Sequence, residues 1–334
     1  MLLVVFLLFL HPHCFKFIGM KKGIFSIMFC LILLVSPALA QTTAELLGYK
    51  PTDRLLIINN DDAGMCHSAN LATIEGLEKG LITTSTIMAP CPWMSEIAEY
   101  AKNHPDKDFG VHLTHTSEWK YYRWGTVAPR DQVKGLLDDA GYLHRNIMSV
   151  YAKATPEEAL IEGRAQIQKL IDAGVPVTHI DSHMGTVQVN PDYFTTYIQL
   201  AAEFNLPMRM ASWETMEKFG AGNGKMRDEL KAQGFVFTDN FIHDEVSGNA
   251  YGKANTKEFW TNIIKNLKPG ITELFIHATI LTDESRSITG SAQKRSEEYQ
   301  CFVTDPDIRQ LMKDEGIILI GYRPLMELQR KNRK

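Results

Sequence analysis

The sequence predicts an α/β protein with a (β/α) barrel-like fold, in which parallel strands carry a site at their C-terminal ends. Short apolar segments alternate with helix-like segments along the chain, which is typical of a parallel sheet. Most apolar runs are nearly continuous, as expected for strands that helices cover on both faces. About 290 residues follow the N-terminal segment, which is enough for a barrel of roughly 250 residues. A doubly wound open sheet is the alternative.

The predicted strands are short runs, and most of them are nearly continuously apolar. In chain order the eight runs are Leu55–Asn60, Thr84–Ala89, Phe109–Thr114, Val177–Ser182, Met208–Ala211, Phe235–Thr238, Leu274–Ala278 and Ile317–Gly321. Roughly eight strands that alternate with helices favour a barrel at this chain length.

The clearest predicted helix starts after Thr155. Thr155 is a good N-cap, Pro156 suits the first helical position, and Glu158 completes a capping box. Gly174 is a typical C-terminal stop. Further helices are expected at Ser68–Lys79 and over residues 191–204, 256–267 and 305–315.

One segment, residues 115–154, breaks this regularity. It is rich in aromatic and turn residues, and we interpret it as a loop insertion over a site. The sequence contains no internal repeat and no low-complexity linker, so residues 41–334 are expected to form a single domain.

The N-terminal 40 residues match a secretory signal peptide. A positive segment at Met20–Lys22 precedes a short apolar run, and Ala38 and Ala40 form a small-residue cleavage site. We expect translation to start at Met20 and the mature protein to be exported to the periplasm or beyond. An uncleaved N-terminal anchor is the alternative, but the apolar run is short for a membrane span.

Charge and cysteine content exclude several classes of protein. Without residues 1–40, which contain three lysines and no acidic residue, the formal net charge falls from −4 to −7. An acidic chain without basic runs argues against nucleic acid as a partner. Cys66, Cys91 and Cys301 remain, without a CxxC pair, so neither a disulfide framework nor a zinc–thiolate site is expected.

Carboxylates and imidazoles occur at the same end of four predicted strands. Asp61 and Asp62 follow the first strand, His112 lies in the third, His183 follows the fourth, and His277 ends the seventh. Each has an ordinary structural alternative, because paired aspartates cap turns and single histidines form hydrogen bonds in cores. Catalytic residues of such barrels cluster at the C-terminal ends of the strands, so their coincidence favours one shared site.

These residue types suit metal-dependent hydrolysis. One carboxylate and two imidazoles can hold Zn²⁺, Mn²⁺, Fe²⁺ or Co²⁺ and leave positions open for water and substrate. A second carboxylate can take a proton from the attacking water, and a fourth-strand or seventh-strand histidine that is not a ligand can protonate the leaving group.

At these positions the chain resembles the YdjC-like carbohydrate deacetylases, which include the chitooligosaccharide deacetylases. The matching segments are Asn59–Gly64, Gly80–Thr86, Gly110–Thr114 and Thr178–His183. The resemblance implies a barrel-like fold, Asp62, His112 and His183 as ligands of a divalent metal, Asp61 as general base and His277 as general acid. The roles of Asp61 and Asp62 can be exchanged in this assignment.

Some positions depart from the family pattern or allow two interpretations. The family often has further histidines after the fourth strand, where this chain has Met184–Thr186, so the substrate need not be a chitooligosaccharide. His179 and Asp181 share a strand face with His183 and either orient ligands or form ordinary interior hydrogen bonds. Arg295 and Glu298, on a predicted helix near the seventh strand, are either substrate contacts or a surface pair, and we favour the surface pair.

The sequence thus predicts a metal-dependent hydrolase that removes N-acetyl groups from an amino sugar or oligosaccharide. The expected cofactor is a divalent ion, with Mg, Zn, Mn and Co as candidates. The expected partner is an acetylated carbohydrate, without a stable membrane anchor, and a homodimer is left open. The alternatives are metal-dependent cleavage of another glycan bond and a non-catalytic carbohydrate-binding relative.

Overall fold

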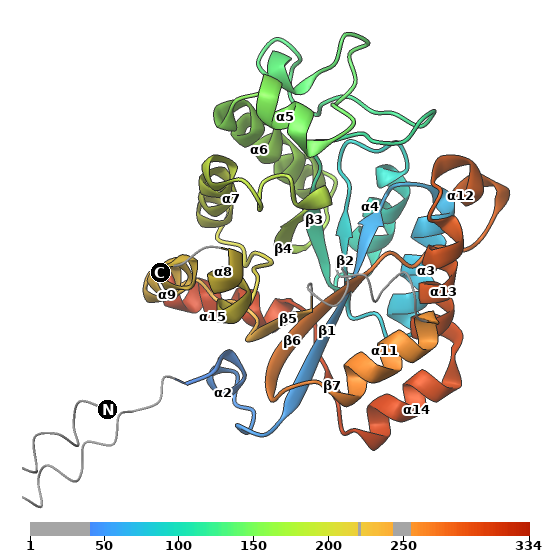
Figure 1. Cartoon of the computed structure of the whole chain (residues 1–334), viewed down its shortest axis with the longest axis vertical. Helices are drawn as coiled ribbons and strands as arrows, with labels where there is room; N and C mark the ends of the chain where they lie inside the picture. Colours follow the sequence, from blue (N-terminus) through green and yellow to red (C-terminus); the bar gives the residue numbers. More distant parts are fainter. Residues whose placement is uncertain (1–40, 220–221, 243–254) are drawn as a thin grey trace, which may run out of the picture. The chain divides into compact units, whose positions relative to one another are not determined.

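A parallel sheet forms the centre of the structure, a computed structural model that describes residues 41–219, 222–242 and 255–334. Its strands are β1 (Arg54–Ala63), β2 (Thr84–Ile87), β3 (Phe109–Leu113), β4 (Val177–Ser182), β5 (Asn240–Ile242), β6 (Gly270–Ile276) and β7 (Ile318–Leu319). They follow the order β4-β3-β2-β1-β6-β5, and every strand pair is parallel (Figure 1). The predicted barrel-like fold with parallel strands is confirmed.

Strand β1 organises the sheet because it is long and has neighbours on both edges. β6 pairs with residues 54–60 along one edge. The other edge is shared, since β7 pairs with Leu55 and Leu56 while β2 pairs further on, from Asn59 to Ala63. The C-terminal end of β1 is therefore held between β2 and β6 in the middle of the sheet.

Side chains of β1 alternate between two apolar environments. Leu56 and Ile58 pack in one buried cluster with Trp260, whereas Leu55 and Ile57 pack in another, on the opposite face of the strand. Burial on both faces explains why β1 reads as an uninterrupted apolar run.

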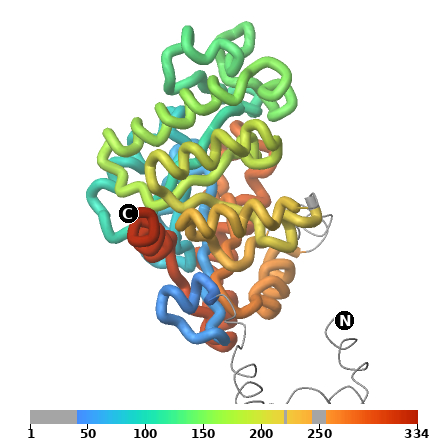
Figure 2. The backbone as a smooth tube through the Cα atoms, turned by 90° about the vertical axis from the view of Figure 1, so that its left-hand side faces the viewer, coloured from blue at the N-terminus to red at the C-terminus, as the bar shows by residue number. Residues whose placement is uncertain are grey.

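Helices surround the sheet. Their bounds are α2 (Thr43–Leu46), α3 (His67–Glu78), α4 (Met94–Asn103), α5 (Ile147–Lys153), α6 (Pro156–Asp172), α7 (Pro191–Glu203), α8 (Trp213–Phe219), α9 (Asn223–Ala232), α11 (Thr256–Lys265), α12 (Asp283–Ile288), α13 (Ala292–Tyr299), α14 (Pro306–Asp314) and α15 (Arg323–Asn332). Helices α6 and α7 lie side by side in both views of the backbone (Figures 1 and 2). The predicted capping box at Thr155 and Glu158 is present at the start of α6.

The predicted strand at residues 235–238 is absent, and the one at residues 208–211 is reduced to a single bridge. Residues 235–238 are not a strand: the Phe237 carbonyl accepts a hydrogen bond from the Thr43 hydroxyl, and the Thr238 carbonyl accepts one from Arg227. The strand of this region is β5, two residues later. Met208 forms a single parallel bridge with Ile180 of β4 in place of a full strand.

The irregular insertion predicted over residues 115–154 is present between β3 and α5, but its last part, Ile147–Lys153, forms helix α5. Between Leu113 and Ile147 its only helical element is η3, a short 3₁₀ turn at Lys134–Leu136. In the portion of the chain that the structure describes, no helix has the length and apolar character needed to cross a bilayer. The predicted signal peptide at residues 1–40 lies outside the described residues and, like the single domain over 41–334, stays a prediction.

Candidate metal centre

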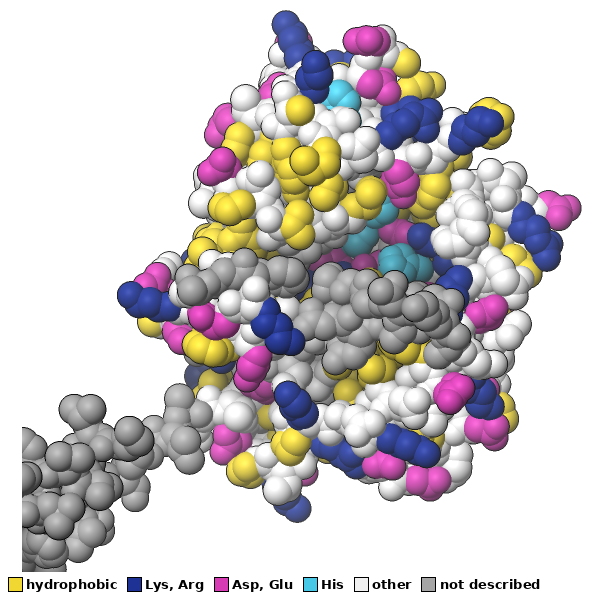
Figure 3. Space-filling view, in the orientation of Figure 1, with side chains coloured by type: hydrophobic (Ala, Val, Ile, Leu, Met, Phe, Trp, Pro, Cys, Tyr) yellow, Lys and Arg dark blue, Asp and Glu magenta, His cyan; other side chains and the backbone are white. Residues whose placement is uncertain are grey.

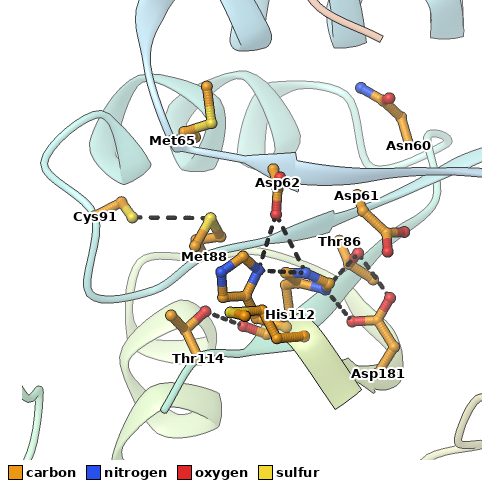
Figure 4. Close-up of polar contacts among 12 residues, drawn as sticks. Asn60, Asp61, Asp62, Met65, Thr86, Met88, Cys91, His112, Thr114 and Asp181 are labelled. Carbon is orange, nitrogen blue, oxygen red and sulfur yellow. Dashed lines mark hydrogen bonds and ion pairs between the residues drawn. The ribbon is translucent and has the colours of Figure 1, made fainter. Parts of the chain in front are cut away.

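The C-terminal ends of β1, β3 and β4 bring Asp62, His112 and His183 together (Figure 4). Strict alternation along β1 would direct Asp61 and Asp62 to opposite faces of the sheet. However, the pairing register between β1 and β2 shifts between Asn60 and Ala63, and Asp62 adopts a left-handed φ of 69°. This irregularity, of the kind that re-aims side chains near active sites, turns both carboxylates toward the same space while Asn60 points away.

The three side chains face one another at short range. Asp62 Oδ1 lies 3.3 Å from His112 Nε2 and 3.2 Å from His183 Nδ1, and the two ring nitrogens are 3.3 Å apart. Each of the three residues is at most 5% exposed. Neither oxygen of Asp62 accepts a hydrogen bond of good geometry. A buried carboxylate and two imidazoles that converge in this way can hold a divalent cation.

A second group, Asp61, His112 and Asp181, also has ligand atoms close together. A cationic side chain already occupies the space between its carboxylates, because Arg209 lies 2.8 Å from Asp61 and 3.0 Å from Asp181. The first group therefore fits a metal ion better.

His112 is held by a carboxylate on the side away from Asp62. Its Nδ1 lies 2.6 Å from Asp181 Oδ1, and Thr86 donates a hydrogen bond to Asp181 Oδ2 at 2.9 Å (Figure 4). Burial by itself would lower the pKa of His112, but the negative charge of Asp181, the hydrogen bond to it and the close contact with Asp62 raise this pKa to about 10. The surrounding carboxylates thus favour a positive charge on the His112 ring. Of the two interpretations of Asp181, the structure supports the one in which it orients a candidate ligand.

His183 has the same arrangement with a different partner. Its Nε2 lies 3.0 Å from Glu118 Oε2, and Glu118 comes from the irregular insertion. Burial opposes the charged form here too, but Glu118 and Asp62 raise the pKa of His183 to about 9. The next residue, Met184, has a left-handed φ of 53°, which bends the chain sharply after β4. Sequence reasoning did not find Glu118.

Asp61 forms a buried ion pair with Arg209. Both guanidinium nitrogens Nη1 and Nη2 lie 2.8 Å from its carboxylate oxygens, and Asn59 donates a further hydrogen bond at 2.7 Å. Burial raises the pKa of Asp61, but Arg209 outweighs this effect and lowers it to about 2. Arg209 also lies 2.7 Å from Glu273, so one cation serves several buried carboxylates. The sequence did contain a signal for this role, because Arg209 lies within a predicted apolar strand. An arginine buried there almost always has an acidic partner.

The interpretation of Arg295 and Glu298 as a surface pair is wrong. Both are buried, at 9% and 2% exposure. Arg295 Nη2 lies 2.7 Å from Asp62 Oδ2 at the candidate centre. Glu298 accepts a hydrogen bond from the backbone N–H of His277 at 2.7 Å, and burial raises the pKa of this carboxyl to about 8.

His277 lies at the same edge of the sheet, directly after β6, but outside the group of three. Its ring is half-buried and packs edge-on against Phe275. Burial and the nearby charge of Arg295 lower the pKa of His277 to about 4, although Asp61 and Asp62 act in the opposite direction. The imidazole is therefore neutral at neutral pH, and the roles of His277 and Asp61 in catalysis stay predictions.

Figure 3 shows histidine side chains at the bottom of a hollow, with acidic and basic side chains beside them. Aromatic residues of the insertion form part of its surroundings, since the Trp119 ring lies 6.4 Å from that of His183. Trp119 and Trp124 are buried and pack on each other, whereas Tyr121 is 81% exposed. The buried histidine His179 stacks on Tyr322 in the interior.

The fold and the site together place this chain among the α/β proteins that have a parallel, barrel-like sheet and a buried Asp-His-His group at the carboxyl ends of its strands. Within this class, the chain belongs to the YdjC-like protein family, whose model matches residues 55–314.

The chain matches curated relatives over nearly the whole length of those relatives. The chain is 27% identical over 269 residues to a carbohydrate deacetylase of Thermoanaerobacter pseudethanolicus, which covers 80% of this chain and 98% of that protein. It is 28% identical over 272 residues to a carbohydrate deacetylase of Brevibacillus brevis, which covers 81% and 99%. A crystal structure from Enterococcus faecalis, described as a cellobiose-phosphate cleavage protein, has a TM-score of 0.68 at 24% identity and covers 82% and 99%. This structural likeness supports the fold.

Proposed function

We propose that this chain is a divalent-metal-dependent hydrolase that removes N-acetyl groups from an amino sugar or oligosaccharide. The buried convergence of Asp62, His112 and His183 is the observation that carries the proposal. Membership of the YdjC-like family and the similarity to proteins named carbohydrate deacetylases support the reaction type. A divalent cation bound by such residues supplies Lewis-acid polarisation of the amide carbonyl.

The geometry favours Asp62 over Asp61 as the metal ligand. Asp62 faces both imidazoles through Oδ1 and meets Arg295 only through Oδ2, whereas Arg209 engages both oxygens of Asp61. The same pairing lowers the pKa of Asp61 to about 2, so its carboxylate is ionised at neutral pH and has free acceptor capacity, while the low pKa also makes it a weaker base than a free aspartate. In our proposal Asp61 takes the proton of the attacking water, and Arg209 holds its carboxylate in a fixed orientation.

His277 is proposed to hand a proton to the departing nitrogen. Because its pKa is lowered to about 4, the protonated imidazole is a stronger acid than free imidazole, and transfer to an amine is favourable. The neutral ring first takes up the proton that Asp61 received from the attacking water and then passes it to the departing nitrogen, so it carries that proton only briefly at neutral pH. In this proposal His277 therefore acts as a proton relay, with no standing positive charge.

Acetate release tests the function directly. Wild-type protein stripped of metal and then supplied with Zn²⁺, Mn²⁺, Co²⁺ or Mg²⁺ is expected to release acetate from N-acetylated sugars, and chelator should abolish the activity. Asp62→Asn should lose both metal and activity, whereas Asp61→Asn should keep the metal and lose activity. Sugar products formed without acetate would instead identify cleavage of another glycan bond, and sugar binding without any product would identify a binding protein.

Export is a separate proposal that rests on the N-terminal sequence. We propose that the protein acts in the periplasm or outside the cell after cleavage following Ala40. N-terminal sequencing of the mature protein checks this, with Gln41 as the expected first residue. A mature chain that still begins near Met20 would contradict it.

A further inference from the structure

The second ring nitrogen of His183 has its own carboxylate partner. His183 Nδ1 faces Asp62, and His183 Nε2 lies 3.2 Å and 3.0 Å from the two oxygens of Glu118. The contact is largely shielded from water, because the side chains of His183 and Glu118 are 6% and 23% exposed. An exposed ion pair would contribute little to stability. This pair is short and shielded, and it fixes the orientation of the His183 ring, a candidate metal ligand.

The loop around Glu118 is anchored on both sides. Ser117 donates its backbone N–H to the His144 carbonyl at 2.8 Å and accepts a hydrogen bond from the Trp124 backbone at 3.1 Å. Arg145 donates to the Trp119 carbonyl at 2.9 Å. Glu118 is therefore held in place by the insertion itself and presents its carboxylate from a fixed position.

The two imidazoles of the centre are held in matching ways. Asp181 takes the nitrogen of His112 that points away from Asp62, and Glu118 takes the corresponding nitrogen of His183. A neutral imidazole binds a metal through one nitrogen only when its proton sits on the other, and a carboxylate at that second nitrogen selects this tautomer. Asp181 belongs to the sheet, whereas Glu118 belongs to the insertion between β3 and α5.

We propose that Glu118 is a positioning residue for His183, which makes metal affinity depend on the insertion over residues 114–146. It holds the proton of His183 on Nε2, leaves Nδ1 free for the cation and fixes the plane of the ring. This inference rests on the proposed metal-dependent function, and it assigns to the insertion a part in building the centre besides covering it.

Metal affinity of matched variants tests this role without reference to catalysis. Zn²⁺ alone is titrated into full-length metal-free protein by calorimetry with a competing chelator. Glu118→Ala is expected to weaken Zn²⁺ binding by about 10- to 100-fold, the usual effect of losing such a partner. Glu118→Gln keeps the shape and one acceptor and should fall between Glu118→Ala and wild type. Asp131→Asn, which removes an exposed carboxylate from the same insertion, should bind like wild type.

A spectroscopic readout separates positioning from a general loss of structure. Nitrogen chemical shifts of the His183 ring in the zinc-loaded protein should report the Nε2–H form in wild type and a shifted or mixed state in Glu118→Ala. Unchanged zinc affinity and unchanged His183 shifts in both Glu118 variants would overturn the inference while leaving the proposed function intact. Absence of zinc binding to wild type would overturn both.

Discussion

The buried cation Arg209 provides the sharpest test of how the interior is stabilised. Its guanidinium lies 2.8 Å from Asp61, 3.0 Å from Asp181 and 2.7 Å from Glu273, and all four side chains are at most 5% exposed. Arg209→Met fills similar volume but leaves these carboxylates without their cation. Breaking one buried pair costs about 3–5 kcal/mol, so we expect at least this loss in the free energy of unfolding, a large part of the roughly 5–15 kcal/mol typical of a domain.

The loss should depend on pH in a defined direction. In wild type Arg209 lowers the pKa of Asp61 to about 2, so the stabilisation from this pair is present above the unfolded pKa of about 3.9 and is lost as pH falls toward 2. In the variant Asp61 stays buried without its cation, so burial should raise its pKa and it should take up a proton as pH falls. The stability difference between the two proteins should therefore narrow toward acid pH.

Urea denaturation of both proteins in chelator, at about pH 7 and about pH 4.5, measures this difference. Arg164→Met is the control, because Arg164 forms a comparably short pair with Glu203 at 2.7 Å but both side chains are more than a third exposed. That variant should lose less than about 1 kcal/mol at either pH. An Arg209→Met loss no larger than that of the control, or one that does not change with pH, would refute the reasoning.

Further predictions concern metal binding, catalysis and local stability. Because the pKa values of His112 and His183 are raised to about 10 and about 9 without metal, metal binding must displace protons, and affinity should fall as pH drops below about 9. Calorimetry in buffers of different ionisation enthalpy measures this release, and pH-independent affinity would contradict it. His277→Asn should lower kcat for acetate release by about 10²- to 10⁴-fold with little change in KM, and an unchanged kcat would remove His277 from the mechanism. Burial lowers the pKa of His115 to about 4, so its contribution to stability should decline by up to about 3 kcal/mol as pH falls from about 6.5 to 4. Urea denaturation should show a smaller decline over this range in His115→Gln than in wild type, and equal declines would contradict this. Thr155→Ala should cost about 0.5–2 kcal/mol of unfolding free energy in the same assay, and no loss would mean that the capping box contributes nothing.

Much of the sheet could be predicted because burial on both faces leaves a local signal. The run at Val177–Ser182 is rich in β-branched residues, and it forms β4 with those bounds. The run at Phe235–Thr238 is more apolar and equally suited to a strand, but it has no strand partner, since distant side chains satisfy its carbonyls. Nothing within that run indicates the contacts with Thr43 and Arg227, so local pattern could not separate the two cases.

The convergence of the candidate centre was predictable for a related reason. Asp62, His112 and His183 follow or end strong strands, and parallel strands place such ends together. Glu118 lies in an irregular insertion, and Arg295 lies on a helix whose buried face could not be assigned from its few apolar residues. Their contacts depend on how separate segments pack, which a single sequence does not encode locally.

Anomalous diffraction from crystals soaked in Zn²⁺ tests the central claim most directly, because it locates the ion and its ligands without relying on activity. We expect one ion between Asp62, His112 and His183, with Glu118 and Asp181 on the outer ring nitrogens and no ion in an Asp62→Asn crystal. A wild-type crystal whose anomalous signal is missing from this position, or lies instead between Asp61 and Asp181, would contradict the account.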